Sequence, residues 1–194
     1  MSDSLITKKA IASSIKELMK KKEVQKISVA DIVENCGINR QTFYYHFKDK
    51  YDLVNWIYYN EVVSAITQNR TYENWSQAVL DVLNIMRKEQ YFYINALSVT
   101  GQNAFQDYFF EATKGILAEM LETIAQEENI EEADIDFMAE FYTYGLVGVT
   151  VQWARRGMKQ SPEEIVQRLT HLIEDIPYLT TEAYFKKYET KKEI

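Results

Sequence analysis

Apolar residues recur at intervals of three and four along most of the chain, which is the periodicity of amphipathic α-helices. Only six Gly and two Pro interrupt the 194 residues, so long helices with short connections are expected. Residues 89–104 are less regular, and residues 186–194 are expected to fray. We therefore predict an all-α fold, with helical stripes over residues 5–22, 28–36, 39–47, 49–67, 75–88, 105–127, 133–156 and 162–176.

The segment 28–47 carries the signals of two short helices joined by a tight turn. Ser28 is suited to cap the first helix, with Asp31 three positions on as its reciprocal partner. Gly37 is a natural left-handed stop, and Asn39 then offers a second cap. Two short helices separated by a turn of three or four residues with Gly have the layout of a helix-turn-helix.

The second of these helices offers polar side chains near its N-terminus. Phe43 and Phe47 lie four residues apart and are expected to face the core. In the major groove, Arg matches the guanine edge and Gln the adenine edge, whereas hydroxyl, imidazole and ammonium groups suit phosphate oxygens. An alternative for the aromatic members is that they only pack within the protein. The candidates for DNA contact are Arg40, Gln41, Thr42, Tyr44, Tyr45, His46 and Lys50.

This N-terminal region resembles that of the TetR family of bacterial regulators, nearly position for position over residues 27–50. The match extends from Ile11 to Leu53, with Met19 and Cys36 as mild departures from the usual residues. The resemblance implies a three-helix helix-turn-helix domain, which we place at residues 1–55, followed by a helical-bundle domain at 56–194 for dimerisation and regulation. By resemblance, Ser28, Thr42, Tyr45, His46 and Lys50 contact phosphates, and Arg40, Gln41 and Tyr44 read bases.

The C-terminal part contains two glycines inside an otherwise strong helical pattern. Each costs roughly 1 kcal/mol relative to Ala, a cost that is tolerated where another backbone comes close. We predict that helices 133–157 and 162–176 pair with their symmetry mates as a four-helix dimer interface, with an intramolecular core as the alternative. The expected interface residues are Gly145, Gly148, Val149, Ile165, Leu169 and Leu172.

Aromatic residues crowd residues 91–110 and recur in the helix 133–157. By family analogy they line an effector pocket, and the alternative is an aromatic core of the bundle. The pocket candidates are Tyr93, Phe105, Tyr108, Phe109, Tyr142 and Trp153. This half also resembles the TetR-like subgroup associated with dihydroxyacetone kinase operons, some of whose members are thought to be activators that use a protein co-regulator. The cues are Phe141, Gly145, Gly148, Trp153 and Gly157, followed by Ser161-Pro162-Glu163-Glu164.

The net charge of −7 is unevenly distributed along the chain. Residues 1–60 hold nine Lys and one Arg against seven Asp or Glu, a net +3, so the remainder carries −10. An acidic body helps to orient the basic end toward DNA, and chance asymmetry is the alternative. One Cys and two His disfavour a disulfide or a zinc site, and no apolar run approaches the roughly 18 residues of a membrane span. With no apolar signal-peptide core at the start, these features predict a cytoplasmic protein without metal or cofactor.

The sequence contains no nucleophile–base set, Gly-rich phosphate loop or metal-ligand spacing, so no catalytic residues and no enzyme are expected. The observations together predict a transcriptional regulator that binds a palindromic operator in double-stranded DNA as a homodimer. A small-molecule effector or a protein co-regulator is expected to control it. The alternative is a helical protein-interaction module without DNA binding, and repressor or activator is left open.

Overall fold

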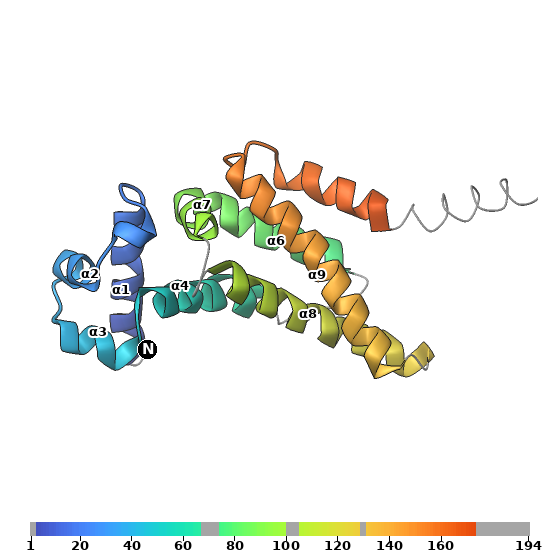
Figure 1. Ribbon diagram of the computed structural model, residues 1–194, viewed down its shortest axis with the longest axis horizontal. Helices are drawn as coiled ribbons and strands as arrows, with labels where there is room; N and C mark the ends of the chain where they lie inside the picture. Colours follow the sequence, from blue (N-terminus) through green and yellow to red (C-terminus); the bar gives the residue numbers. More distant parts are fainter. Residues whose placement is uncertain (1–2, 67–73, 100–104, 129–130, 174–194) are drawn as a thin grey trace, which may run out of the picture.

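The computed structural model describes residues 3–66, 74–99, 105–128 and 131–173, and within these ranges every regular element is helical. The prediction of an all-α fold is therefore confirmed (Figure 1). None of the described helices is long and apolar enough to cross a membrane. The last three residues of the predicted helix 162–176 and the predicted frayed end at residues 186–194 lie outside the described residues.

Three helices form one end of the molecule: α1 (Asp3–Met19), α2 (Val29–Cys36) and α3 (Arg40–His46). A short 3-10 turn, η1 (Val24–Lys26), connects α1 to α2. These elements pack together because their apolar stripes converge on one core. That core includes Ile11, Ile15, Ile27, Ile32, Phe43 and Phe47, each at most 3% exposed.

A helical segment leads from this end into the body (Figure 1). It consists of α4 (Lys50–Tyr58), the π-helical turn η2 (Tyr59–Val63) and α5 (Ser64–Ile66). The predicted domain boundary after residue 55 falls inside α4, which contacts both α1 and α8. The two predicted domains therefore share one helix.

The body is built from α6 (Trp75–Lys88), α7 (Gln90–Ser98), α8 (Phe105–Glu128) and α9 (Glu132–Arg155). The long helices α8 and α9 pack against each other (Figure 1). Ion pairs also link the two helices. The Lys114 ammonium of α8 lies 2.8 Å from the Asp136 carboxylate and 3.6 Å from the Glu140 carboxylate, both on α9. Residues 162–173 form a further helix after the end of α9.

Residues 90–98 form the regular helix α7, although the sequence predicted a less regular segment at residues 89–104. Phe92, Tyr93, Ala96 and Leu97 are all buried, as two adjacent pairs one helical turn apart. The helix packs against α1, α6, α8 and α9. Its buried residues share one face, but Tyr91 and Ile94 add apolar side chains on the other side, which blurs the two-faced pattern. The remainder of that segment, residues 100–104, lies outside the described residues.

The end of α9 is shaped by residues that reverse the chain. Gly157 has a φ of 73° and Met158 a φ of 52°, and the Met158 amide donates to the Trp153 carbonyl at 2.9 Å. Ser161 then caps the following helix, accepting from the Glu164 amide at 3.2 Å. This reversal brings the helix 162–173 back along α9 (Figure 1).

Candidate nucleic-acid interface

The first helix of the predicted helix-turn-helix is fixed by local hydrogen bonds at both ends. The Ser28 hydroxyl accepts from the Asp31 amide at 3.1 Å, and the Asp31 carboxylate accepts from the Ser28 amide at 2.7 Å. These bonds from Ser28 hold the pKa of Asp31 below its ordinary value. Gly37 ends α2 with a φ of 71°, a left-handed conformation that favours glycine. The predicted caps of α2 are confirmed.

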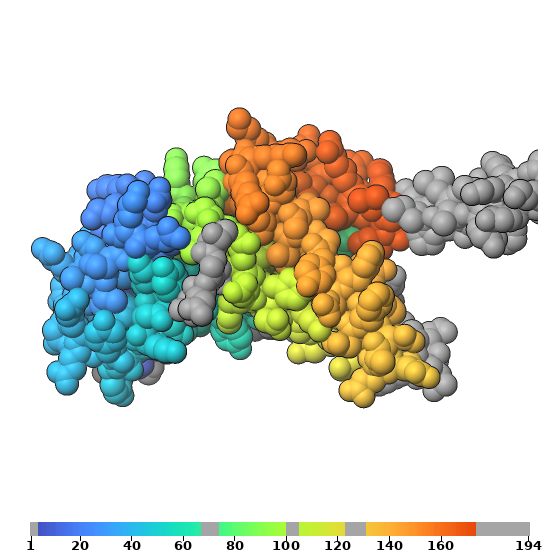
Figure 2. All heavy atoms as spheres, viewed as in Figure 1, coloured from blue at the N-terminus to red at the C-terminus, as the bar shows by residue number. Residues whose placement is uncertain are grey.

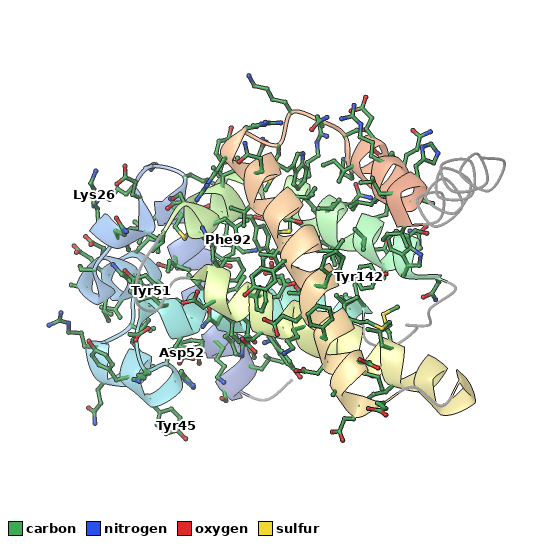
Figure 3. The ribbon with its side chains drawn as sticks, turned by 45° about the vertical axis from the view of Figure 1, so that its right-hand side comes forward. Lys26, Tyr45, Tyr51, Asp52, Phe92 and Tyr142 are labelled. Carbon is green, nitrogen blue, oxygen red and sulfur yellow. The ribbon has the colours of Figure 1, made fainter. Side chains whose placement is uncertain are left out.

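The second helix, α3, presents one face to solvent. Asn39 caps it by accepting from the Thr42 amide at 2.8 Å, while Phe43 is fully buried. Tyr44 is 55% exposed and Tyr45 82% exposed, and Figure 3 shows Tyr45 directed away from the body. These two tyrosines therefore do not fill the core. The outward face comprises Arg40, Gln41, Tyr44 and Tyr45, which share a side because they are spaced i, i+1, i+4 and i+5.

The remaining DNA-contact candidates are engaged within the domain itself. The Ser28 hydroxyl donates to Asp31 at 2.7 Å and that of Thr42 to Asn39 at 3.0 Å, so a phosphate contact from either hydroxyl requires an exchange of partner. His46 is half-buried at the end of α3. Of these candidates, Ser28 is exposed and lies at the N-terminus of α2, where helix amides favour anions.

Lys50 lies beside that same helix start. Its ammonium donates to the carbonyls of Gln25 at 2.9 Å and Ile27 at 2.7 Å, which leaves one of its three N–H groups for an external acceptor. Burial lowers the pKa of Lys50, although the nearby carboxylates of Asp49 and Asp31 act in the opposite direction. The side chain thus holds the turn before α2 as well as carrying charge. Figure 2 shows these N-terminal helices as one end of the molecule.

Asn95 of α7 joins this domain to the body, a role that sequence reasoning missed. Its side-chain amide donates to the carbonyls of Met19 at 3.1 Å and Lys22 at 2.7 Å, and its carbonyl oxygen accepts from the Val24 amide at 2.8 Å. Asn95 thereby satisfies backbone groups at and after the end of α1. The available signal was a lone amide residue within an apolar run, flanked by Ile94 and Ala96.

A second link joins α1 to the body through charges. The Lys16 ammonium donates to the Glu61 carboxylate at 2.6 Å and lies 3.7 Å from that of Glu89. It also lies 5.5 Å from the centre of the Phe92 ring, within the range of a cation–π contact. Lys16 and Asn95 together hold α1 against η2 and α7.

Replacing Asn95 with Ala is expected to lower the free energy of unfolding by roughly 1–3 kcal/mol, because the buried Val24 amide loses its acceptor. Urea denaturation measures this loss, and hydrogen exchange should show faster exchange at Val24. The control is Asn84→Ala on the exposed side of α6, which is expected to change stability little. Equal stability of the two variants would contradict the assigned role of Asn95.

Within the described part of the chain, the predicted effector residues do not line one shared cavity. The rings of Tyr93, Phe105, Tyr108 and Phe109 instead pack around Tyr58, at centroid distances of 6.5, 5.4, 6.3 and 5.5 Å respectively. Tyr142 is 38% exposed on α9 (Figure 3). Trp153 is buried and donates its indole N–H to the Gln160 carbonyl at 3.0 Å.

A cavity of about 80 Å³ does lie between α4, α5, α6, α8 and α9. Of the six predicted effector residues, only Phe109 lines it. Tyr93, Phe105 and Trp153 are buried elsewhere, where their large rings fill the space between helices, whereas Tyr142 is exposed. The lining residues that sequence reasoning missed include Tyr58, Trp75, Thr113, Met120 and Thr150.

The predicted dimer residues divide between surface and interior. Gly145 and Gly148 are exposed, and a Cβ added at either would meet no heavy atom within 4 Å, so neither glycine serves a close approach within its own subunit. Val149 is 40% and Leu172 54% exposed, and Leu169 is half-buried. Ile165 is only 5% exposed, so it packs in the subunit's own core and offers little surface to a partner.

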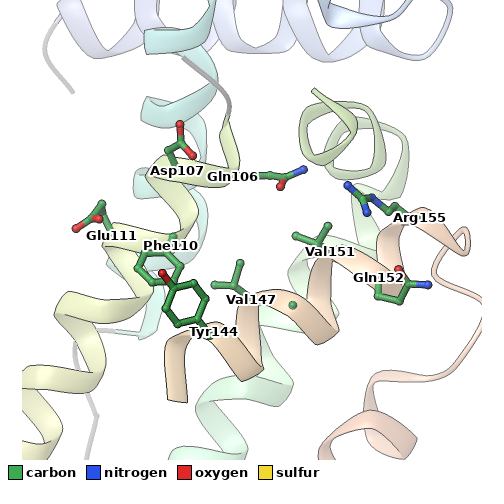
Figure 4. A pocket seen from close by; sticks show the side chains of 10 residues that line it. Gln106, Asp107, Phe110, Glu111, Tyr144, Val147, Val151, Gln152 and Arg155 are labelled. Carbon is green, nitrogen blue, oxygen red and sulfur yellow. The ribbon is translucent and has the colours of Figure 1, made fainter. Parts of the chain in front are cut away.

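Gly148 also lines a groove of about 600 Å³ between α8 and α9 (Figure 4). Phe110 of α8 and Tyr144 of α9 pack against each other in its lining, with ring centroids 4.7 Å apart. The groove carries both charge signs, since Asp107 and Arg155 line it together. On the α9 side, the groove therefore exposes Tyr144 and Gly148 beside polar and charged side chains.

Comparison with known families matches both halves of the chain. Residues 11–57 match the family described as bacterial regulatory proteins, tetR family, and residues 73–175 match one described as a transcriptional regulator C-terminal region. The chain is 27% identical over 175 residues to the HTH-type dhaKLM operon transcriptional activator DhaS of Lactococcus lactis subsp. lactis (strain IL1403), covering 89% of this chain and 91% of that protein.

Solved structures show the same relationship. The dihydroxyacetone kinase operon activator DhaS is 26% identical, with a TM-score of 0.66 over 87% of this chain and 94% of that one. Native NalD, the secondary repressor of the MexAB-OprM multidrug efflux pump in Pseudomonas aeruginosa, is 17% identical, with a TM-score of 0.53 over 87% and 94% of the two chains. The likeness to NalD supports the fold alone.

Proposed function

Because the chain belongs to the TetR family of DNA-binding transcriptional regulators, we propose that it binds a near-palindromic operator as a homodimer under the control of an effector or a protein co-regulator. The observation that carries the proposal is the outward face of α3, where Arg40 and Gln41 are exposed beside two exposed tyrosines. The family matches point to a regulator rather than an enzyme. We place its action in the cytoplasm, where operator DNA is found in bacteria.

The residue roles in this proposal follow from position on the domain. Arg40, Gln41 and Tyr44 read base edges, since they lie at the start and on the outer side of a short helix suited to the major groove. Phosphates are contacted by groups that flank this helix and the N-terminus of α2. These phosphate-contacting residues are Ser28, Thr42, Tyr45, His46 and Lys50.

The proposed dimer forms through the exposed side of α9 and the helix 162–173. It is supported by the open surroundings of Gly145 and Gly148 on α9 and by the exposure of Val149 and Leu172. A two-fold dimer presents two recognition helices about 34–36 Å apart, or a multiple of that distance, and so favours an inverted repeat. Both DhaS relatives are described as activators, which favours activation over repression for this chain.

Selection of DNA fragments retained by the purified full chain, followed by sequencing, tests the proposal. We expect enrichment of an inverted repeat with half-site centres about 10 base pairs apart, or a multiple of that spacing. No enrichment over random fragments would instead support a helical interaction module. A single unrepeated site would contradict the two-fold dimer.

Replacing Lys50 with Met is expected to weaken binding to all DNA and to lower the slope of log K against log salt by about 0.9, as one phosphate contact is lost. The variant also loses the two bonds to the Gln25 and Ile27 carbonyls, so its folding is checked by urea denaturation. Lys159→Met removes the same charge from an exposed site after α9 and should leave the slope unchanged. An unaltered slope in a folded Lys50→Met protein would remove Lys50 from the phosphate contacts.

A further inference from the structure

Three large aromatic side chains lie exposed in a row along the first part of α9. Phe137 is 71%, Phe141 66% and Tyr144 64% exposed, and their spacing of i, i+4 and i+7 places them on one face of the helix. Single exposed apolar side chains are ordinary on a protein surface, whereas a contiguous group of large ones marks an interaction site. We call these three residues the aromatic row.

The aromatic row leads into the groove of about 600 Å³ between α8 and α9 (Figure 4). Tyr144 belongs to both, since it lines the groove and packs against Phe110 of α8. Val147 and Val151 continue the apolar lining along α9. A groove between two long helices, with apolar side chains along it, is the kind of surface that accepts an amphipathic helix.

The surroundings of the aromatic row are acidic. Residues 115–154 hold nine Asp or Glu and no Lys or Arg. Asp107 and Glu111 of α8 line the groove with exposed carboxylates, and neither has an ion pair within the described part of the chain. Of the two cations that flank the segment, Lys114 is already paired with two carboxylates of α9, and Arg155 lies at the other end of that helix. A partner with Lys or Arg at its edge therefore complements this surface.

The same charges disfavour a second copy of the chain as the occupant. Two such segments face to face would each carry a net charge of −9 into the contact, and like charges across an interface are unfavourable. The proposed dimer contacts Gly145 and Val149 are turned by about 80° and 120° around α9 from Phe137, at roughly 100° per residue. They also lie in residues 141–154, which hold no Asp or Glu.

We propose that the aromatic row and the adjoining groove dock a protein partner through an amphipathic helix with an apolar face and a basic edge. The apolar face covers the aromatic row, and the basic edge lies against Asp107 and Glu111. The proposal rests on the proposed function, since it gives the docking surface and the chemistry of a protein co-regulator. The DNA-binding face stays accessible in this arrangement, because α3 lies at the opposite end of the molecule (Figure 1).

A synthetic peptide tests the surface without DNA. The probe is a fluorescent amphipathic helix of about four turns, with Leu along one face and Lys at both edges of that face. Fluorescence anisotropy with the full chain should show saturable binding. A second peptide with Glu in place of every Lys should bind roughly tenfold more weakly or worse. Equal binding of the two peptides would overturn the basic partner, and no saturable binding of the Lys peptide would overturn the docking surface.

Two exposed rings provide the matched variants. Phe141→Ser should weaken binding of the Lys peptide roughly tenfold or more, because an aromatic anchor of the contact is lost. Tyr91→Ser removes a ring that is 62% exposed on α7, away from the groove lining, and should leave the affinity unchanged. Equal affinities of these two variants would refute the role of the aromatic row.

The carboxylates of the groove have a test of their own. Replacing Asp107 with Asn and Glu111 with Gln in one variant should narrow the difference in affinity between the Lys and Glu peptides. The side chains keep their size while the charges are lost, so packing along the groove is preserved. A difference as large as in the unchanged chain would refute the contact of the basic edge with these two residues.

Sedimentation and operator binding separate this proposal from the others. The Phe141→Ser protein should remain a dimer and bind operator DNA like the unchanged chain. A folded but monomeric Phe141→Ser protein would assign the aromatic row to the dimer interface and overturn its docking role. Failure of the unchanged chain to select an operator would count against the proposed function while leaving the peptide result intact.

Discussion

Replacing Gly148 with Leu is expected to separate the dimer into monomers without unfolding the subunit. Gly148 is exposed, and an added Cβ meets no heavy atom within 4 Å, so a larger side chain is accommodated in the single subunit. Leucine also stabilises a helix by up to about 0.8 kcal/mol relative to glycine. At a two-fold contact, however, the new side chains from both copies would hold the helices apart.

Sedimentation of the variant should give the 22.8 kDa mass of one chain at micromolar concentration. Its operator affinity is expected to fall by roughly 10²–10⁴-fold, because two linked recognition helices bind far more tightly than one. Gly115→Leu is the matched control, since Gly115 on α8 is exposed with equally open surroundings and should leave the dimer intact. If the Gly148→Leu variant is folded and still dimeric, the dimer interface does not include Gly148. If the unchanged chain is a monomer, the proposed dimer is refuted.

Substituting Arg40 or Gln41 with Ala is expected to cost roughly 1–3 kcal/mol of binding to the cognate operator and to relax specificity at particular base pairs. Both side chains are exposed in the first turn of α3, whose start is capped by Asn39 rather than by either of them. The substitutions should therefore leave the fold of the domain unchanged, because alanine also favours helix.

Fluorescence anisotropy with cognate and random duplexes measures this effect. The loss should be large on the cognate site and small on random DNA. Arg156→Ala removes one exposed positive charge at the end of α9 and should leave the ratio of the two affinities as it was. Equal losses on both duplexes for Arg40→Ala would assign Arg40 to the phosphate backbone instead.

The local architecture of the N-terminal domain is encoded in neighbouring residues of the chain. The capping bonds of Ser28 with Asp31 and of Asn39 with Thr42 join residues three apart, and the turn at Gly37 depends on one backbone conformation. Interactions this short are encoded within a few neighbouring residues, so they can be read without knowing the fold. The burial of Phe43 and Phe47 followed from helical spacing in the same way.

By contrast, the residues that form the cavity and those that join the domains are set by packing between helices distant in sequence. Aromatic density allowed either an effector pocket or a bundle core for Tyr93, Phe105 and Trp153, which are buried without lining the cavity. The cavity walls come from helices distant in sequence, and Asn95 meets Met19 across 76 positions. Periodicity along one helix indicates which face is buried, but not which helix covers it or where the packed side chains leave a void. The same reason explains Ile165, whose position on an apolar stripe predicted an interface although its own subunit already buries it.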